Sequence, residues 1–322
     1  MKPFESFLTS KLEDYIDYRK SLGYTDKGLR YLLMPLDRYV REKKADWDSL
    51  KPSFFLDLRG KIKKEPRTVN EILCGIRGFF QFLVRTGHLE ENPLQDIPPL
   101  AQRAYIPFIF SSDETEELFS AIQGRVRKTE DHFLKDLTLH LAVVLLAGCG
   151  LRIREPTRLL RTHYRAREGT LYIEKTKFKK DRLIPAPKKV RVQIDNYLAV
   201  RGSLLHEDQN PYLLWAPEKR KLSINGIYSV FHQAVKDIGL NEPRKVMDNI
   251  TFGSPTPHSL RHSFAVNTLK RLKEQGKSPQ YALPILCAYM GHRKYRYTAL
   301  YLKVLDAEHR KGLVDFALHH KR

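Results

Sequence analysis

The sequence predicts a mainly α-helical protein of two domains, with a small β-sheet in the second domain. Three observations support this fold class. Apolar residues recur every three or four positions over residues 4–94, a proline-rich stretch follows, and the later residues combine further helical patterns with one pair of β-forming segments. At 322 residues the chain is long enough for two domains, each with its own core.

The first domain, residues 1–98, is expected to contain four short helices. Their apolar positions fall at residues 8–16, 29–40, 54–58 and 69–83. Apolar faces of this length cannot be buried by one helix alone, so the four helices should pack together around a shared core.

Local signals set the expected limits of these helices. Gly23 should end the first, and Thr25 is a candidate N-cap for the second, in which Pro35 predicts a kink. Thr68 followed by Glu71 predicts a capping box at the start of the fourth helix.

The prolines at residues 93, 98, 99 and 107 predict a stiff, extended connection, and the second domain is expected over residues 105–322. Ser111 and Glu114 form a second candidate capping box. The nearly apolar stretch 133–147 predicts a helix buried on all sides, as in the centre of a domain.

Glycines end that central helix and are expected to place Arg152 at the start of another, with Pro156 in its first turn. Residues 170–174 and 182–185 predict a β-hairpin around a basic turn, which makes this domain mixed α+β. Beyond residue 190 the patterns are mostly helical, apart from a polar loop expected at 241–257.

The composition indicates an anionic partner. Lys and Arg number 57 against 37 Asp and Glu, a formal net charge of +20, which attracts polyanions such as DNA. A membrane is a weaker alternative, because no run of about 18 apolar residues is present. Residues 1–16 lack the apolar core of a signal peptide, and three isolated cysteines fit a reducing compartment, so a cytoplasmic protein without a disulfide frame is expected.

Side chains suited to a phosphodiester occur in five separated segments. These are GLRIRE (150–155), KTKFKKDRLIP (175–185), PHSLRHSFA (257–265), MGH (290–292) and ALYLK (299–303). Arginine binds two phosphate oxygens at once and keeps its charge, whereas a tyrosine hydroxyl can attack phosphorus. Together the segments predict phosphoryl transfer.

The order of these residues resembles the catalytic domain of tyrosine recombinases, the phage-integrase family. An arginine, a lysine, His-x-x-Arg and Gly-His appear in turn, and a tyrosine follows nine residues after the last histidine. The resemblance implies catalytic roles for six residues: Arg152, Lys177, His258, Arg261, His292 and Tyr301.

By this resemblance Arg152 and Arg261 clamp the phosphate, while His258 is a phosphate ligand and a candidate proton shuttle for the tyrosine. His262 lies about 100° around a helix from Arg261 and is expected to be structural. Glu155 is expected to orient the site through hydrogen bonds instead of transferring a proton.

Tyr301 is the expected nucleophile, because of its distance from His292 along the chain, and Tyr295 and Tyr297 are assigned to packing or DNA-backbone contacts. By the family resemblance, a lysine of the hairpin turn is the general acid that protonates the leaving 5′ oxygen; Lys177 is the expected residue, with Lys175 as the alternative.

The family resemblance further implies a core-binding domain that clamps double-stranded DNA, a 3′-phosphotyrosyl intermediate, and four protomers on two DNA sites. Residues 302–322 are amphipathic. By the same resemblance they are expected to dock into a neighbouring protomer, and folding back onto their own domain is the alternative. No P-loop, acidic two-metal cluster or HExxH motif is present, so no metal or cofactor is expected.

Two alternatives stay open from the sequence, a type IB topoisomerase and a catalytically silent DNA-binding protein of the same fold. Phage integration, transposition and resolution of replicon multimers are all compatible biological roles.

Overall fold

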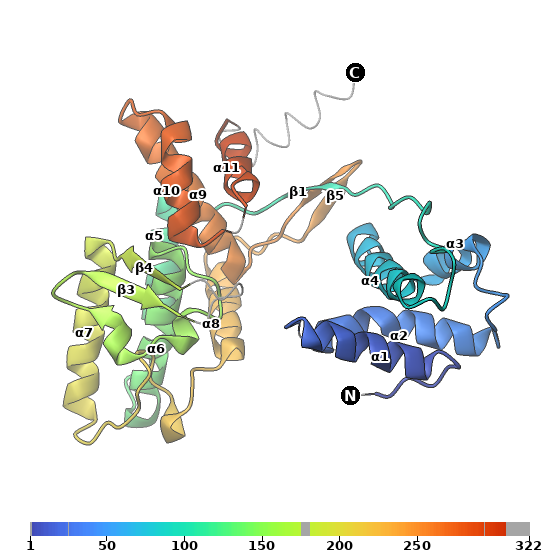
Figure 1. The fold of residues 1–322 in the computed structure, drawn as a ribbon. Helices are drawn as coiled ribbons and strands as arrows, with labels where there is room; N and C mark the ends of the chain where they lie inside the picture. The colour runs from blue at the N-terminus through green and yellow to red at the C-terminus, as the bar shows by residue number, and fades with distance from the viewer. Residues whose placement is uncertain (1, 25, 175–180, 293, 307–322) are drawn as a thin grey trace. The chain divides into compact units, whose positions relative to one another are not determined.

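The computed structural model describes residues 2–24, 26–174, 181–292 and 294–306, and the chain divides into two compact units, Met1–Arg103 and Ala104–Arg322 (Figure 1). The described residues are mostly helical, with two small three-stranded sheets. The predicted fold class is confirmed. No helix among these residues is long and apolar enough to cross a membrane.

The first unit contains four helices within the described residues: α1 (Thr9–Ser21), α2 (Asp26–Glu42), α3 (Pro52–Lys61) and α4 (Pro66–Arg85). Their apolar positions form one core, as the periodicity predicts. Glycines let α4 approach its neighbours, because a Cβ on Gly75 would lie 2.8 Å from the Cβ of Leu32, and one on Gly78 would lie 2.6 Å from the hydroxyl of Tyr15.

The expected limits of these helices hold only in part. α4 begins at Pro66, whose fixed φ suits a first turn, so the predicted capping box at Thr68 and Glu71 is wrong. α2 runs through Pro35. The candidate cap Thr25 lies outside the described residues.

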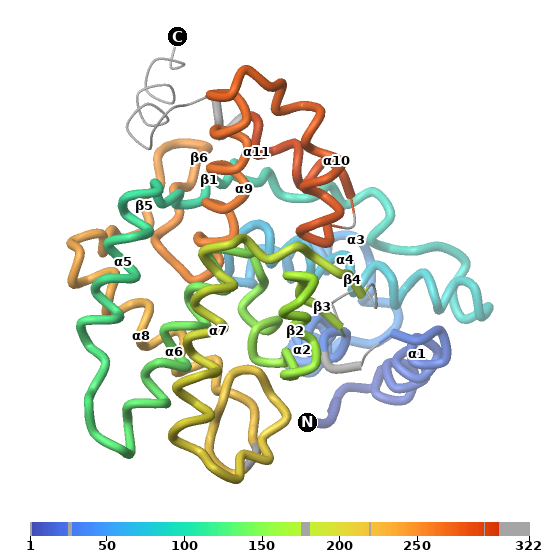
Figure 2. Tube along the Cα trace, turned by 90° about the vertical axis from the view of Figure 1, so that its left-hand side faces the viewer, coloured from blue at the N-terminus to red at the C-terminus, as the bar shows by residue number. Residues whose placement is uncertain are grey.

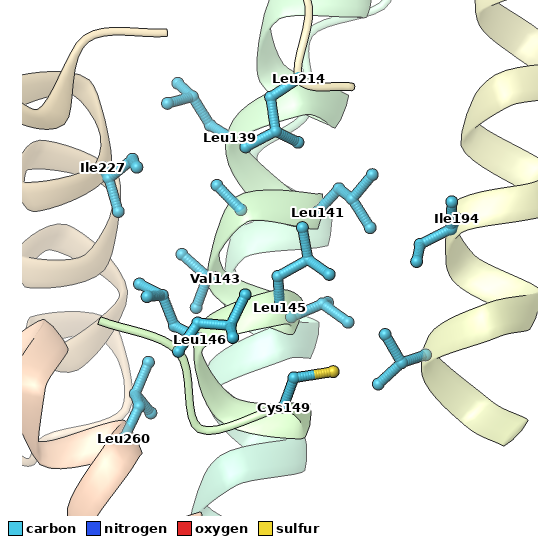
Figure 3. Close-up of a cluster of buried hydrophobic side chains, with 14 of the residues drawn as sticks. Leu139, Leu141, Val143, Leu145, Leu146, Cys149, Ile194, Leu214, Ile227 and Leu260 are labelled. Atoms are coloured by element: carbon cyan, nitrogen blue, oxygen red, sulfur yellow. The ribbon is translucent and has the colours of Figure 1, made fainter. Parts of the chain in front are cut away.

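A central helix organises the core of the second unit. α6 (Glu130–Gly148) lies between α7 (Lys188–Leu204) and α8 (Ile224–Asp237) (Figure 2). Its side chains point to both neighbours, with Leu141 and Leu145 toward Ile194 of α7 (Figure 3). This confirms the predicted buried helix.

α5 (Ser112–Gly124) packs against α6 and α8. The predicted capping box is confirmed here, since Ser111 Oγ accepts from the amide of Glu114 at 3.1 Å, and the Glu114 carboxylate accepts from the amide of Ser111 at 2.8 Å. Both partners are three residues apart, so a local pattern was enough to predict the contact.

The predicted hairpin is also confirmed. β3 (Thr170–Ile173) pairs antiparallel with β4 (Arg182–Pro185), and β2 (Tyr164–Arg165) extends this sheet. The turn at residues 175–180 lies outside the described residues, and with it both candidate general acids.

The region expected to be a polar loop contains two strands. β5 (Lys245–Met247) and β6 (Ile250–Phe252) form a hairpin, and β1 (Ala104–Ile106) pairs parallel with β6. Strands of three residues are too short to show a period of two, and the pairing of β1 with β6 links residues far apart in the sequence.

The last helices of the described residues are α9 (Pro257–Glu274), α10 (Pro279–Met290) and α11 (Arg296–Asp306), which pack against one another at one end of the second unit (Figure 1). Gly291 ends α10 in the left-handed conformation, with φ of 63°. Residues 307–322, most of the predicted interaction tail, lie outside the described residues.

Candidate active site

A turn after α6 brings the first arginine of the motif toward α9. Gly150 has φ of 57°, and a Cβ at this position would lie 2.5 Å from the ring of Phe264 on α9, so glycine is needed both for the backbone and for the close approach. Arg152 follows in a turn, and the next element is only the 3₁₀ helix η1 (Pro156–Arg158). The prediction that Arg152 begins an α-helix is therefore wrong.

Glu155 joins two arginines in a partly buried ion-pair network. Its carboxylate accepts from the amide of Arg152 at 2.9 Å and from the Arg152 guanidinium at 2.9 Å. The guanidinium of Arg182, on β4, donates to the same carboxylate at 3.1 and 2.8 Å and to the carbonyl of Tyr289 at 2.8 Å. The expected orienting role of Glu155 is visible in these contacts, whereas the sequence did not point to Arg182.

Burial alone would raise the pKa of Glu155, but the hydrogen bonds and charge of Arg182 outweigh it and hold the pKa below its ordinary value. Glu155→Gln should therefore destabilise the second unit by roughly 3–5 kcal/mol at pH 7, the usual cost of breaking a buried ion pair. Urea unfolding measures this change. Glu116→Gln is the matched control, because Glu116 pairs with Lys189 on the exposed surface and should matter little.

The effect should also depend on pH. A carboxylate whose pKa is lower in the folded state contributes stability above its unfolded pKa of about 4.3, and this contribution is lost as the pH falls through the folded pKa. The difference between wild type and Glu155→Gln should therefore shrink in acid. A difference that stays constant from pH 7 to pH 3 would mean that the network does not carry this stability.

Arg261 is buried and held by backbone carbonyls. Its guanidinium donates to the carbonyls of Gly150, at 2.6 Å, and Met290. Arg152 donates to the neighbouring carbonyl of Gly291 at 2.7 Å. Burial, and then the charge of Arg152, lower the pKa of Arg261 to about 9, so the side chain stays cationic at pH 7. Two arginines thus anchor on one turn, at residues 290 and 291.

The proposed nucleophile lies among histidines. Tyr301 on α11 is 5% exposed, and its hydroxyl lies 3.0 Å from Nδ1 of His262. The ring of His262 packs edge-on against that of His258 at 4.6 Å, and the ring of His292 lies 6.2 Å from that of Tyr301. Nδ1 of His292 is 2.8 Å from the hydroxyl of Thr298.

His262 is thus in contact with the proposed nucleophile, whereas the sequence favoured a structural role. Its position one residue after Arg261 suggested a different helix face, but it also lies four residues after His258, on the same face as that histidine. That spacing was the signal that could have identified it.

Burial is the largest cause of the shifted pKa values of the histidines and the tyrosine in this cluster. Burial, together with the charges of nearby groups including Arg261, lowers the pKa of His258 to about 4 and those of His262 and His292 to about 3. The three imidazoles are therefore neutral at pH 7. Burial also raises the pKa of Tyr301, while Arg261 and Arg152 oppose this rise by favouring the phenolate.

The structure thus brings together five of the six predicted site residues: Arg152, His258, Arg261, His292 and Tyr301. The sixth, Lys177, and its alternative Lys175 lie outside the described residues. The competing tyrosines, Tyr295 and Tyr297, are about half exposed, at 48% and 45%. Within the described ranges, no group of three or more His, Cys, Asp or Glu side chains could hold a metal ion.

Comparison with known proteins identifies the chain. Residues 109–308 match the phage integrase family. The chain belongs to this family. It is 30% identical over 305 residues to y4rE of Sinorhizobium fredii, described as an integrase/recombinase, with 94% of this chain and 93% of that protein covered.

The tyrosine recombinase XerA of Pyrococcus horikoshii is 26% identical over 321 residues, with 97% of this chain and 96% of XerA covered. The similarity to named recombinases thus extends over both units. The protein is a tyrosine recombinase, a DNA breaking-and-rejoining enzyme, and the family and function predicted from the sequence are confirmed.

Solved structures share the fold. XerH bound to a palindromic difH substrate aligns with a TM-score of 0.68 at 17% identity and covers 96% of this chain and 83% of XerH. A dimer of lambda integrase residues 75–356 bound to a COC′ core site aligns with a TM-score of 0.64 at 18% identity, covering 89% of this chain and 96% of that fragment.

Proposed function

We propose that this recombinase attacks the scissile phosphodiester of duplex DNA with Tyr301, forming a 3′-phosphotyrosyl link and releasing a 5′ hydroxyl. The observation that carries this proposal is the position of the Tyr301 hydroxyl, buried on α11 in the same cluster as Arg152 and Arg261. A 5′ hydroxyl from a second duplex then reverses the step, so the bond energy is retained and no nucleotide is consumed.

The cluster suits each requirement of phosphoryl transfer. Arg152 and Arg261 neutralise the non-bridging oxygens, and their guanidinium groups are already oriented by the adjacent carbonyls of Gly291 and Met290, which lowers the cost of reorganisation. His258 and His292 are assigned as further phosphate ligands, donating through ring N–H groups.

We assign the first unit to DNA binding, as the domain that clamps the duplex together with the catalytic unit. A concave surface formed by α2, the end of α3 and the residues after it is lined by basic side chains, which include Arg38, Lys61, Lys63 and Lys64, with Lys2 from the N-terminal segment. Such a surface suits the phosphate backbone, whose contacts carry most of the sequence-independent affinity of DNA-binding proteins.

We assign the active assembly as four protomers on two DNA sites. A lambda integrase with this fold is described as a tetramer bound to a Holliday junction. Two tests together examine the function. The protein should form a covalent adduct with a nicked suicide duplex, whereas a catalytically silent DNA-binding protein would form none. It should also exchange strands between two separate DNA sites, whereas a type IB topoisomerase, which acts on one duplex, would not.

The general acid is assigned to Lys177, with Lys175 as the alternative. Lys177→Ala should block cleavage of normal DNA and regain activity on a substrate whose leaving 5′ oxygen is replaced by sulfur, because a thiolate leaves without a proton. Lys179→Ala is the matched control and should show little defect. Rescue at Lys175 would move the role by two residues, and rescue at neither would exclude a lysine of this turn as the acid.

The C-terminal segment is assigned to contacts between protomers. Truncation after Lys311 removes Leu313, Val314, Phe316 and Leu318, which can each contribute about 1.5–3 kcal/mol when buried. Single-site DNA binding should persist, while synapsis and recombination should be lost in gel-shift and exchange assays. His319→Ala, a polar change in the same segment, is the control. A truncated protein that unfolds, or that still joins two sites, would contradict the assignment.

A further inference from the structure

The hydroxyl of Tyr301 has a specific partner from another helix. Nδ1 of His262 on α9 lies 3.0 Å from the Tyr301 oxygen on α11, and the two rings meet at 60° with centroids 5.7 Å apart. α9 and α11 pack directly against each other, so the helix interface itself fixes this pair. The atom proposed to attack phosphorus is thus already in hydrogen-bond contact with an imidazole.

The neighbouring histidines are oriented differently. His258 places its ring against that of His262, with an interplanar angle of 83°. His292 directs Nδ1 to the hydroxyl of Thr298. Of the three imidazoles in the site, His262 is therefore the one placed to receive a proton from Tyr301.

The protonation states fit this direction of transfer. Burial, followed by the charges of neighbouring groups, keeps His262 neutral at pH 7 by lowering its pKa, and burial raises the pKa of Tyr301. The tyrosine is consequently the donor, and Nδ1 of the neutral imidazole is the acceptor.

We propose that His262 is the base that takes the proton of Tyr301 during attack, an inference that rests on the function proposed above. The Tyr301 oxygen forms a bond to phosphorus, and its proton moves to Nδ1 of His262. The bond from phosphorus to the 5′ oxygen breaks, and that oxygen leaves with the electron pair and takes a proton from the general acid. In rejoining, the bond from phosphorus to Tyr301 breaks, and His262 returns the proton to the tyrosine oxygen.

Bound DNA favours this transfer. A phosphodiester held by Arg152 and Arg261 brings negative charge into the cluster, which offsets the two guanidinium charges and raises the pKa of a nearby imidazole. His262 therefore becomes a stronger base when the substrate is in place. In this scheme His258 remains a phosphate ligand that packs against the base.

The test compares two replacements of His262 in the full-length protein. His262→Asn places an amide oxygen near the position of Nδ1 and keeps a hydrogen-bond acceptor without a base, whereas His262→Ala removes both. Single-turnover formation of the covalent adduct on a suicide duplex is measured from pH 6 to pH 9. His132, a partly exposed residue of α6, gives the control, His132→Ala, which should match wild type.

Both variants should lose about 10²–10⁴-fold in rate at pH 7, the range for general base catalysis. Their rates should then rise about tenfold per pH unit, because without a base only the phenolate attacks. The titratable and charged groups facing His262 are His258 and Arg261 on its own helix, with His292 and Tyr301 from the neighbouring segments. Wild type, in which His262 supplies the base, should show a shallower profile.

An unchanged rate, or a loss by the same factor at every pH, would overturn the role as base. Failure of wild type itself to form the adduct would instead refute the function on which the inference rests. If the variants do not fold, ¹⁵N NMR of the histidines gives a second test in stable proteins. Tyr301→Phe should shift the Nδ1 signal of His262, and an unchanged signal would contradict the proposed pair.

Discussion

Tyr301→Phe should abolish the covalent DNA adduct and all strand exchange, while DNA affinity stays close to that of wild type. The change removes one hydroxyl and keeps the buried ring, so the packing of α11 on α9 is retained. Loss of the hydrogen bond to His262 should alter stability by only about 1 kcal/mol. Denaturing gels of the suicide-substrate reaction measure the adduct, and gel shifts measure the affinity.

Tyr297→Phe is the matched control, since this tyrosine lies four residues earlier on the same helix and is 45% exposed. It should form the adduct at the wild-type level. An adduct that persists in Tyr301→Phe but disappears in Tyr297→Phe would show that Tyr297, and not Tyr301, is the nucleophile.

Most of the predictions that hold for the fold depend on local determinants. Apolar periodicity identified the helices of the first unit, and the capping box at Ser111 and Glu114 depends on residues three apart. The small sheet of β1, β5 and β6 was missed, because it pairs Ala104 with Ile250 across most of the second unit. No periodicity reports a contact of that range.

The candidate site shows the same division between local and distant determinants. The sequence motifs predicted Arg152, Arg261 and Tyr301 as site residues, because these residue types suit phosphate chemistry. The contacts between distant residues were not visible, since Arg182 lies 27 residues from its partner Glu155 and His262 lies 39 residues from Tyr301. The four-residue spacing places His262 on the same helix face as His258, and the folded chain shows that His262 is the histidine in hydrogen-bond contact with the Tyr301 hydroxyl.

Arg152→Ala should lower the rate of adduct formation by about 10²–10³-fold, the usual cost of removing one preorganised donor from a site of charge development. The fold should survive, because Glu155 keeps its two hydrogen bonds to Arg182 and the Arg152 side chain is already 22% exposed. Thermal unfolding checks the fold, and single-turnover cleavage checks the rate. Arg161→Ala is the control, because it removes the same charge from an exposed arginine paired with Asp208.

Arg152→Lys separates charge from geometry. The Arg152 guanidinium donates to Glu155 through Nη1 and to the carbonyl of Gly291 through Nη2, so its plane is fixed before DNA binds. Lysine carries the same charge but has no planar fork to make both contacts and bind phosphate. The lysine variant should therefore recover only part of the lost rate. Full recovery would mean that Arg152 acts through charge alone, and would remove the oriented clamp from the mechanism.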